Sequence, residues 1–220
     1  MEQSYCINLL TGLGTSLGGS NYKSGGRRFI KNEESCLKSV KRLRREMKAD
    51  EKYEKNNTLL LLGDLQALKS YLIPLAVGYC DHDEGLLAEI TKVVVMMTMP
   101  LGVCDAKNFP EKRIRHLRNF KSEFMEKKAL QAFMRLLDRP LQRVGGQSKA
   151  EDKGIVELVL WLIRNLLAIP DAPVSTTTAS KDAHLVNLHE DFLLMLEREC
   201  ILDVLFYLGE YIGNEGNRDW

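Results

Sequence analysis

Basic side chains gather in two stretches, 38–48 and 107–128, whose spacing could serve phosphate binding. The first stretch holds six cations among eleven residues, and Glu46 is its one acid. Cations along a helical face attract a nucleic-acid backbone by Coulomb forces and by the release of counterions. Nothing in their spacing favours contact with base edges, so they predict sequence-independent contact with duplex DNA, with a merely solvated face as the alternative. The candidate residues are Lys38, Lys41, Arg42, Arg44, Arg45 and Lys48, followed by Arg113, Arg115 and Arg118.

Other chemistry-bearing residues do not combine into a recognisable catalytic or metal site. The glycines of residues 12–18 are spaced G-x-G-x-x-x-G, which differs from the nucleotide-binding pattern, and a loop explains them better. The run Asp81-His82-Asp83-Glu84 beside Cys80 has metal-ligand types. Consecutive residues do not converge easily on one ion, so a turn that caps the next helix is the better interpretation. We expect no catalysis, no metal and no cofactor.

The cysteines and the apolar runs limit where the protein works. The five cysteines, Cys6, Cys36, Cys80, Cys104 and Cys200, are scattered and never form a C-x-x-C pair, which argues against a disulfide framework. The N-terminal residues lack the basic and apolar regions of a secretory signal. The longest apolar runs fall short of the ~20 residues that cross a bilayer. These features predict a soluble intracellular protein with no membrane partner.

Charge is segregated along the chain although the formal net charge is only +1. Residues 1–48 carry 10 basic and 4 acidic groups, and residues 105–148 carry 11 and 5. Residues 49–104 carry 4 and 8, and residues 149–220 carry 6 and 13. With 45% hydrophobic and 28% charged residues the chain is typical of a folded globular protein. Its two basic blocks could therefore face a polyanion while its end stays acidic.

Helical periodicity dominates the sequence, and no convincing alternation of apolar and polar residues indicates a strand. Gly63 and Pro74 are expected to break or kink a helical stretch over 59–80, and prolines 100, 140 and 170 to follow helix ends. The remaining helices are predicted over 34–48, 84–99, 113–138, 151–169, 182–198 and 200–213. We therefore predict an all-α fold.

One apolar pattern occurs twice, 69 residues apart. Leu86, Ile90, Val93, Val94 and Met97 have the same offsets as Ile155, Val159, Leu162, Ile163 and Leu166, and a proline follows each set. Any buried helix can show such a stripe, but stripes this wide are typical of inner helices in stacked repeats. They predict an armadillo/HEAT-like α-solenoid in which Ile90, Val94, Val159 and Leu162 are buried and Asn165 is hydrogen-bonded.

The same reasoning predicts what two helices expose. In the helix over 34–48, Leu37, Val40 and Met47 should face the body, which leaves Lys41, Arg44, Arg45 and Lys48 in water, because the acids nearby in sequence are few. In the helix over 200–213, we expect Leu205, Leu208 and Ile212 to be exposed as an uncapped repeat end.

Several motifs, taken in order, resemble the N-terminal domain of the Timeless family. They are ESCLKSVKRLRREM (34–47), GDLQALKSYLIPL (63–75), LLAEITKVVVMMTMP (86–100), FKSEFMEKKAL (120–130) and EDKGIVELVLWLIRNLLAIP (151–170). The resemblance covers about residues 34–210. It implies a domain division into a Timeless-like helical-repeat domain over 34–220, the first part of a longer protein, preceded by an N-terminal helix and flexible Gly/Ser-rich loop over 1–33.

The resemblance also implies a function. Timeless proteins are non-enzymatic armadillo-like scaffolds of the nucleus that pair with Tipin in the replication fork protection complex. They contact the replicative helicase and duplex DNA and support fork pausing and checkpoint signalling. The alternative is an armadillo-type adaptor outside replication, such as a circadian or trafficking scaffold.

Overall fold

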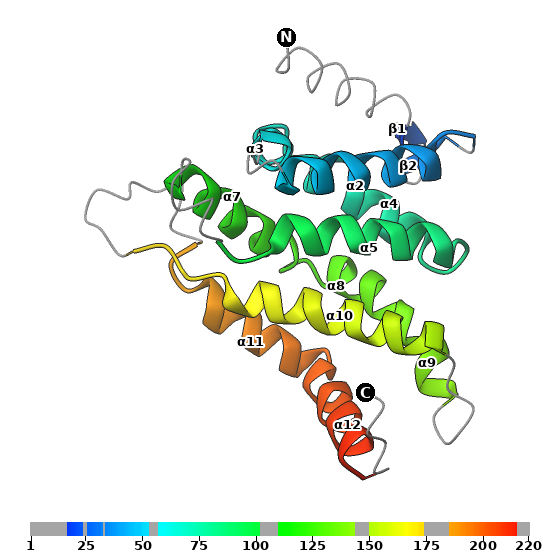
Figure 1. The fold of residues 1–220 in the computed structure, drawn as a ribbon, viewed down its shortest axis with the longest axis vertical. Helices are drawn as coiled ribbons and strands as arrows, with labels where there is room; N and C mark the ends of the chain where they lie inside the picture. Colours follow the sequence, from blue (N-terminus) through cyan, green and yellow to red (C-terminus); the bar gives the residue numbers. More distant parts are fainter. Residues whose placement is uncertain are drawn as a thin grey trace.

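The computed structural model shows a mostly helical chain whose helices are layered along its long axis (Figure 1). It describes residues 17–23, 26–32, 34–52, 57–101, 110–143, 150–173 and 185–214. The elements are β1 (Gly18–Lys23), β2 (Gly26–Lys31), α2 (Cys36–Lys52), α3 (Asn57–Asp64), η1 (Leu68–Leu72), α4 (Ile73–Tyr79), α5 (Glu84–Thr98), α7 (Pro110–Glu123), α8 (Lys127–Met134), η2 (Arg135–Leu137), α9 (Asp138–Gln142), α10 (Ala150–Ala168), α11 (Leu188–Arg198) and α12 (Ile201–Asn214).

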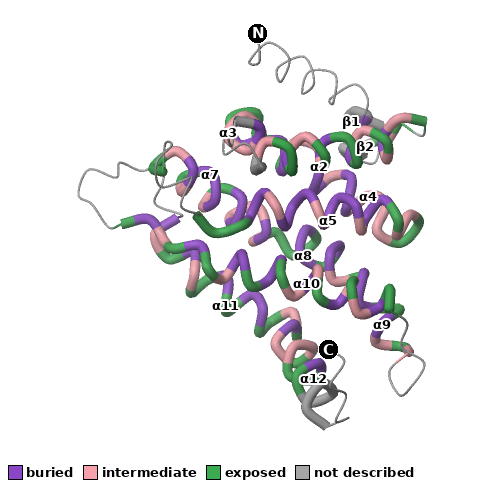
Figure 2. The backbone as a smooth tube through the Cα atoms, in the orientation of Figure 1, coloured by how far each residue is buried: buried purple, intermediate pink, exposed green. Residues whose placement is uncertain are grey.

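Helices α2, α5 and α10 lie in successive layers, and α5 packs against both of the others (Figure 1). The sides on which these helices meet are buried (Figure 2). Ile90, Val94, Val159 and Leu162 have an exposed fraction of 0%, which confirms the prediction of two inner helices. Asn165 is 1% exposed, and its Nδ2 donates to the carbonyl oxygen of Val95 at 3.1 Å, as expected for a buried amide.

The all-α prediction needs one correction, because β1 and β2 form a two-stranded antiparallel hairpin. We predicted a loop in this Gly/Ser-rich part of residues 1–33. The available signal was the dipeptide Ser24-Gly25, which marks turns, but the other glycines nearby obscured it. The N-terminal helix predicted within 1–33, and residues 12–16 of the glycine run, lie outside the described residues.

The single long helix predicted over 113–138 is also wrong. The structure divides this region into α7, α8, η2 and α9. The first break lets the buried rings of Phe124 and Phe133 meet, with 5.4 Å between their centroids. Pro140 does not end a helix but is the third residue of α9, where an amide hydrogen would have no intrahelical acceptor. The helix predicted over 182–198 is shorter than expected and begins at Leu188.

The break predicted near Gly63 lies slightly further along the chain. Gly63 stays inside α3, and the chain turns at Gln66, whose φ of 48° is left-handed. Helix α4 follows directly on the π-helical turn η1, whose last hydrogen bond runs from the Ile73 N–H to the Leu68 carbonyl. Pro74 is the second residue of α4. The helical stretch therefore bends at Gln66, while the missing N–H of Pro74 is accommodated at a helix start.

Helix α12 exposes apolar side chains, but not those we predicted. Leu208 is 3% exposed, so that prediction is wrong, while Leu205 is half-buried and the side chain of Ile212 lies outside the description. Phe206 and Tyr207 are instead exposed, by 71% and 49%. The exposed apolar residues therefore lie one or two positions away from the predicted ones along the helix.

Among the described residues, no single helix has the length and apolar content to cross a bilayer. The helical segments Thr58–Asp64 and Leu68–Tyr79 are long and apolar enough only when taken together, and a 68° bend separates them.

Candidate nucleic-acid interface

Helix α2 forms the outer layer of the described fold, held by an apolar stripe and a capped N-terminus. Val40, Leu43 and Met47 are at most 2% exposed and pack in the core next to α5. Before the helix, Asn32 accepts on its carbonyl from the Cys36 N–H at 2.9 Å. Its side-chain Oδ1 accepts from the backbone N–H groups of Glu34 and Ser35 at 3.2 and 3.3 Å. One face of α2 is thereby fixed toward the body.

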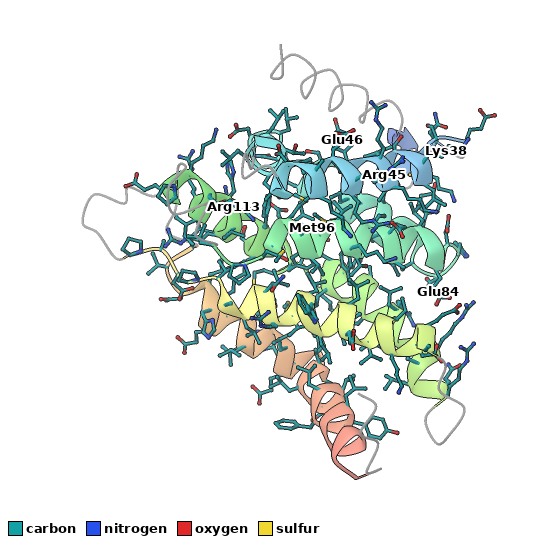
Figure 3. All side chains as sticks on the ribbon, in the orientation of Figure 1. Lys38, Arg45, Glu46, Glu84, Met96 and Arg113 are labelled. Carbon is teal, nitrogen blue, oxygen red and sulfur yellow. The ribbon has the colours of Figure 1, made fainter. Side chains whose placement is uncertain are left out.

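The opposite face of α2 is basic and exposed. Figure 3 labels Lys38, Arg45 and Glu46 along this helix. Arg42 and Glu46 are one turn apart, with 4.0 Å between Nε and Oε1. The exposed cations are Lys38, Lys41, Arg42, Arg45 and Lys48. They form the surface that we call the α2 basic face.

Arg44 does not belong to the α2 basic face, which corrects the prediction that it lies unpaired in water. Its Nε is 3.0 Å from Oε2 of Glu89 on α5, and Oε1 of Glu89 accepts from Lys92 at 2.8 Å. Burial acts to raise the pKa of Glu89, but the Lys92 hydrogen bond and the charges of Lys92, Arg44 and Lys41 together lower it. Arg44 therefore ties α2 to α5. Its partner lies 45 positions away in sequence, so the local composition could not reveal it.

Arg113, predicted to contact DNA, is in fact buried in the described fold. It is 1% exposed, and its Nη2 donates to the Met97 carbonyl at 2.9 Å, at the end of α5 (Figure 3). Arg118 is half-buried and donates from Nε to the Pro170 carbonyl at 3.0 Å. Of the three candidates on α7, Arg115 alone is exposed. The second basic stretch therefore serves mainly to hold helices together.

Lys121 at the end of α7 shows the same use of a cation. It is 0% exposed, and its Nζ donates to the Ile169 carbonyl, just beyond α10, at 3.0 Å. The Nδ1 of His189 on α11 lies 3.3 Å from the same Nζ, and the ring centroid of Phe192 lies 5.6 Å from it. Burial lowers the pKa of Lys121, and the charge of Asp171 acts in the opposite direction. The ammonium group joins α7, α10 and α11.

A second polar junction joins α3 to α7. Asp64 Oδ1 lies 3.2 Å from Nε2 of His116, and Asp64 Oδ2 accepts from Lys112 Nζ at 2.6 Å. His116 is 4% exposed and packs against Gly63, and its Nδ1 is buried without a hydrogen-bond partner among the described residues. Burial lowers the pKa of His116. The charge of Asp64 acts to raise this pKa, whereas the nearby cations lower it further; these are Lys112, Arg113 and Arg115. The folded state therefore favours neutral His116.

We expect this junction to make stability fall on mild acidification. Because the folded pKa of His116 lies below its ordinary value of 6.5, the unfolded chain binds a proton first as the pH drops through 6.5. The free energy of unfolding should then decrease until the pH reaches the folded pKa of His116. Below that pH, His116 should cause no further decrease. Urea unfolding between pH 7.5 and 5.0 would measure the decrease, and His116→Gln should remove it.

The exposed His82 provides the control for that experiment, since His82→Gln should keep the decrease. The pKa values of Asp83 and Glu89 are lowered, so their contributions disappear only below the ordinary carboxylate values of 3.8 and 4.5. A decrease of equal size in the His116→Gln protein would contradict the assignment.

No metal site emerges among the described residues. No group of three or more His, Cys, Asp or Glu side chains in the described part of the chain is placed to hold a metal ion. Asp83 instead caps α5 by accepting from the Leu86 N–H at 3.0 Å, which confirms the capping prediction for residues 81–84. A groove of about 490 Å³ between α4, α8, α9 and α12 contains Cys80. Burial and the neighbouring Asp81 raise the pKa of this thiol, which favours its unreactive protonated form.

Layered helices, with an outer basic helix and interlayer contacts made by buried cations, define the described part of the chain as a helical stack with a polycationic surface on α2. The sequence model of the Timeless protein matches residues 30–220. The chain therefore belongs to the Timeless family.

Three relatives support this assignment. The protein timeless homologs of Mus musculus and Homo sapiens are each 26% identical to this chain, over 195 and 191 residues that cover 85% and 83% of it. The mating-type switching protein swi1 of Schizosaccharomyces pombe is 26% identical over 199 residues, or 82% of the chain. These matches cover only 16%, 15% and 20% of the respective relatives.

Proposed function

We propose that this chain is a non-enzymatic scaffold of the nuclear replication fork protection complex, and that its α2 basic face contacts duplex DNA without reading sequence. Membership of the Timeless family supports the replication role. The proposed scaffold is an armadillo/HEAT-like solenoid that links the replicative helicase, a Tipin-like subunit and parental DNA. The layering of α2, α5 and α10 supports that architecture, because a solenoid stacks its helical units so that each one packs against its neighbours.

The observation that carries the DNA proposal is the division of α2 into two faces. Its apolar stripe is buried, while Lys38, Lys41, Arg45 and Lys48 are exposed along the other side. Seventeen helical residues extend over about 25 Å, long enough to follow several backbone phosphates. Because Arg113 and Lys121 are buried, the α7 stretch competes little for this role.

We expect the variant Lys38/Lys41/Arg45/Lys48→Ala to bind duplex DNA more weakly and with a smaller salt dependence. Each lost phosphate contact should reduce the slope of log K against log salt by about 0.9. Fluorescence anisotropy with two scrambled duplexes across a salt series would measure the change, which should be equal for both sequences.

The matched control removes four exposed cations from other helices, outside both basic stretches, with the variant Arg135/Arg139/Arg164/Arg198→Ala. It changes the net charge by the same amount, so its slope should stay close to that of the wild type. Equal slopes for the α2 variant and the wild type would contradict DNA contact by α2. Absence of DNA affinity together with absence of helicase subunits in a co-purification would favour the adaptor outside replication.

A further inference from the structure

Glu89 on α5 holds one cation from each of two layers. Its Oε2 lies 3.0 Å from Nε of Arg44 on α2, and its Oε1 accepts from Nζ of Lys92, almost one turn further along α5, at 2.8 Å. The side chain of Glu89 is only 11% exposed, so its carboxylate lies mainly inside the contact between the two helices. Through this carboxylate, the ammonium group of Lys92 has a fixed position relative to α2.

Lys41, a member of the α2 basic face, belongs to the same group of charges. It precedes Arg44 by three residues, and residues three apart are neighbours on a helix surface, with about 5–6 Å between their Cβ atoms. The charge of Lys41 is also among those that lower the pKa of Glu89. Three cations thus gather at one carboxylate, and the group keeps a positive net charge.

Lys92 stays accessible to an anion although it is paired. Its side chain is 41% exposed, compared with 27% for Arg44. An ammonium group has three N–H donors, and the hydrogen bond to Glu89 uses one of them. Figure 3 labels Met96, which follows Lys92 by one turn along this side of α5 and is half-buried too. The described fold therefore leaves this strip of α5 partly open to solvent next to α2.

The spacing of the two layers agrees with contact to one duplex. Packed helices have axes about 8–10 Å apart, whereas a single major groove of B-DNA is about 12 Å wide. A duplex that lies along α2 would therefore also cover the neighbouring strip of α5. DNA carries one phosphate charge per about 1.7 Å of its axis, so a phosphate is available close to each exposed cation beneath it.

We propose that the DNA-contact surface continues from α2 onto α5, with Lys92 contacting a backbone phosphate next to one contacted by Lys41. This inference rests on the proposed function, because it requires a duplex on the α2 basic face. Glu89 is the positioning residue, since a cation that is already held in place loses less conformational entropy on binding. The inference assigns a binding role to a lysine that lies outside both basic stretches of the sequence.

The experiment removes the ion pair without changing the net charge. Glu89→Gln/Lys92→Gln in the 220-residue chain deletes one acid and one base, so a change in binding reports the lost contact. We expect weaker binding to scrambled duplexes and a slope of log K against log salt that is smaller by about 0.9. Fluorescence anisotropy across a salt series measures both.

Lys69→Gln/Glu123→Gln is the matched control. It deletes another lysine–glutamate pair, between η1 and α7, with 2.9 Å between Lys69 Nζ and Glu123 Oε1. Lys69 also lies outside both basic stretches. The slope of this control should equal that of the wild type. An equal reduction in both double variants would contradict the assignment to Lys92.

Two single variants separate the contact from folding. Lys92→Gln leaves the pair of Arg44 and Glu89 in place and should reduce the slope by the same amount, while urea unfolding should show a protein as stable as the wild type to within the range of surface changes. Lys92→Arg keeps a cation at this position and should keep the slope.

Outcomes for α5 and for α2 are separable. If the α2 variant loses its salt dependence while Lys92→Gln keeps the wild-type slope, the extension onto α5 is wrong and the proposed function stands. If the wild-type chain shows no affinity for duplex DNA, the proposed function itself is wrong, and the extension with it. Reduced slopes for both variants, which add in the combined variant, support one surface built from two layers.

Discussion

Truncating Leu162 to alanine should destabilise the fold by roughly 2–5 kcal/mol, the range for large-to-small changes in a packed core. Leu162 is 0% exposed and lies at the centre of α10, the helix that packs against α5. Helix α10 also packs against η2 and α9, so closing the cavity would require one of these packed elements to move. Urea unfolding followed by circular dichroism measures the change in the free energy of unfolding.

Leu193→Ala is the matched control, because the same side chain on α11 is 39% exposed. Its cost should be well under half that of Leu162→Ala, since little apolar area returns to water. A loss below about 1 kcal/mol for Leu162→Ala would mean that α10 is not an inner helix.

Adding one methyl group at Gly63 should destabilise the fold by roughly 1–3 kcal/mol, toward the upper end of that range. A Cβ at this position would overlap Nδ1 and Cγ of the His116 ring. The ring is not a flexible chain end, because it is 4% exposed and lies against Asp64 through Nε2. Either α3 or α7 must shift, and the free energy of unfolding from urea titration reports the cost.

Two further variants identify the cause. Gly154→Ala on α10 meets nothing within 4 Å and should stabilise the protein by about 0.5–1 kcal/mol, as glycine-to-alanine changes do in open helix positions. Gly63→Ala combined with His116→Ala should cost less than the sum of the two single changes, because the second removes the ring that the methyl group meets. If the losses in the free energy of unfolding of the two single variants simply add, the methyl group at Gly63 does not act through the His116 ring.

The inner layers were predictable because their sequence pattern is strong and local. The stripes of α5 and α10 repeat at helical spacing over about three turns, so the burial of Ile90, Val94, Val159 and Leu162 followed from periodicity alone. Asn165 was predictable from the same argument, since an amide on a buried stripe needs a partner. The break after Glu123 was not, because it depends on where Phe124 and Phe133 meet.

The candidate site was harder to predict, because a cation has the same local pattern whether it binds phosphate or a distant carbonyl. Arg44, Arg113 and Lys121 occur in basic runs, yet their partners lie 45, 16 and 48 positions away. Their roles follow from packing between layers. The exposed cations of α2 were predictable because, within the described residues, the helix packs mainly against α5 and α3 through a narrow apolar stripe.

Three contacts between helices are made in the same way. In each, a buried polar side chain donates a hydrogen bond to a main-chain carbonyl at or just beyond the C-terminal end of another helix. Asn165 binds Val95, Arg113 binds Met97, and Lys121 binds Ile169. Apolar layers alone can slide or rotate past one another at small cost, whereas a directional bond inside a dry contact permits only one arrangement. The stack should therefore resist twisting and bend little between α5, α7 and α10. A force applied to one of these three helices would therefore displace all three together as one rigid body.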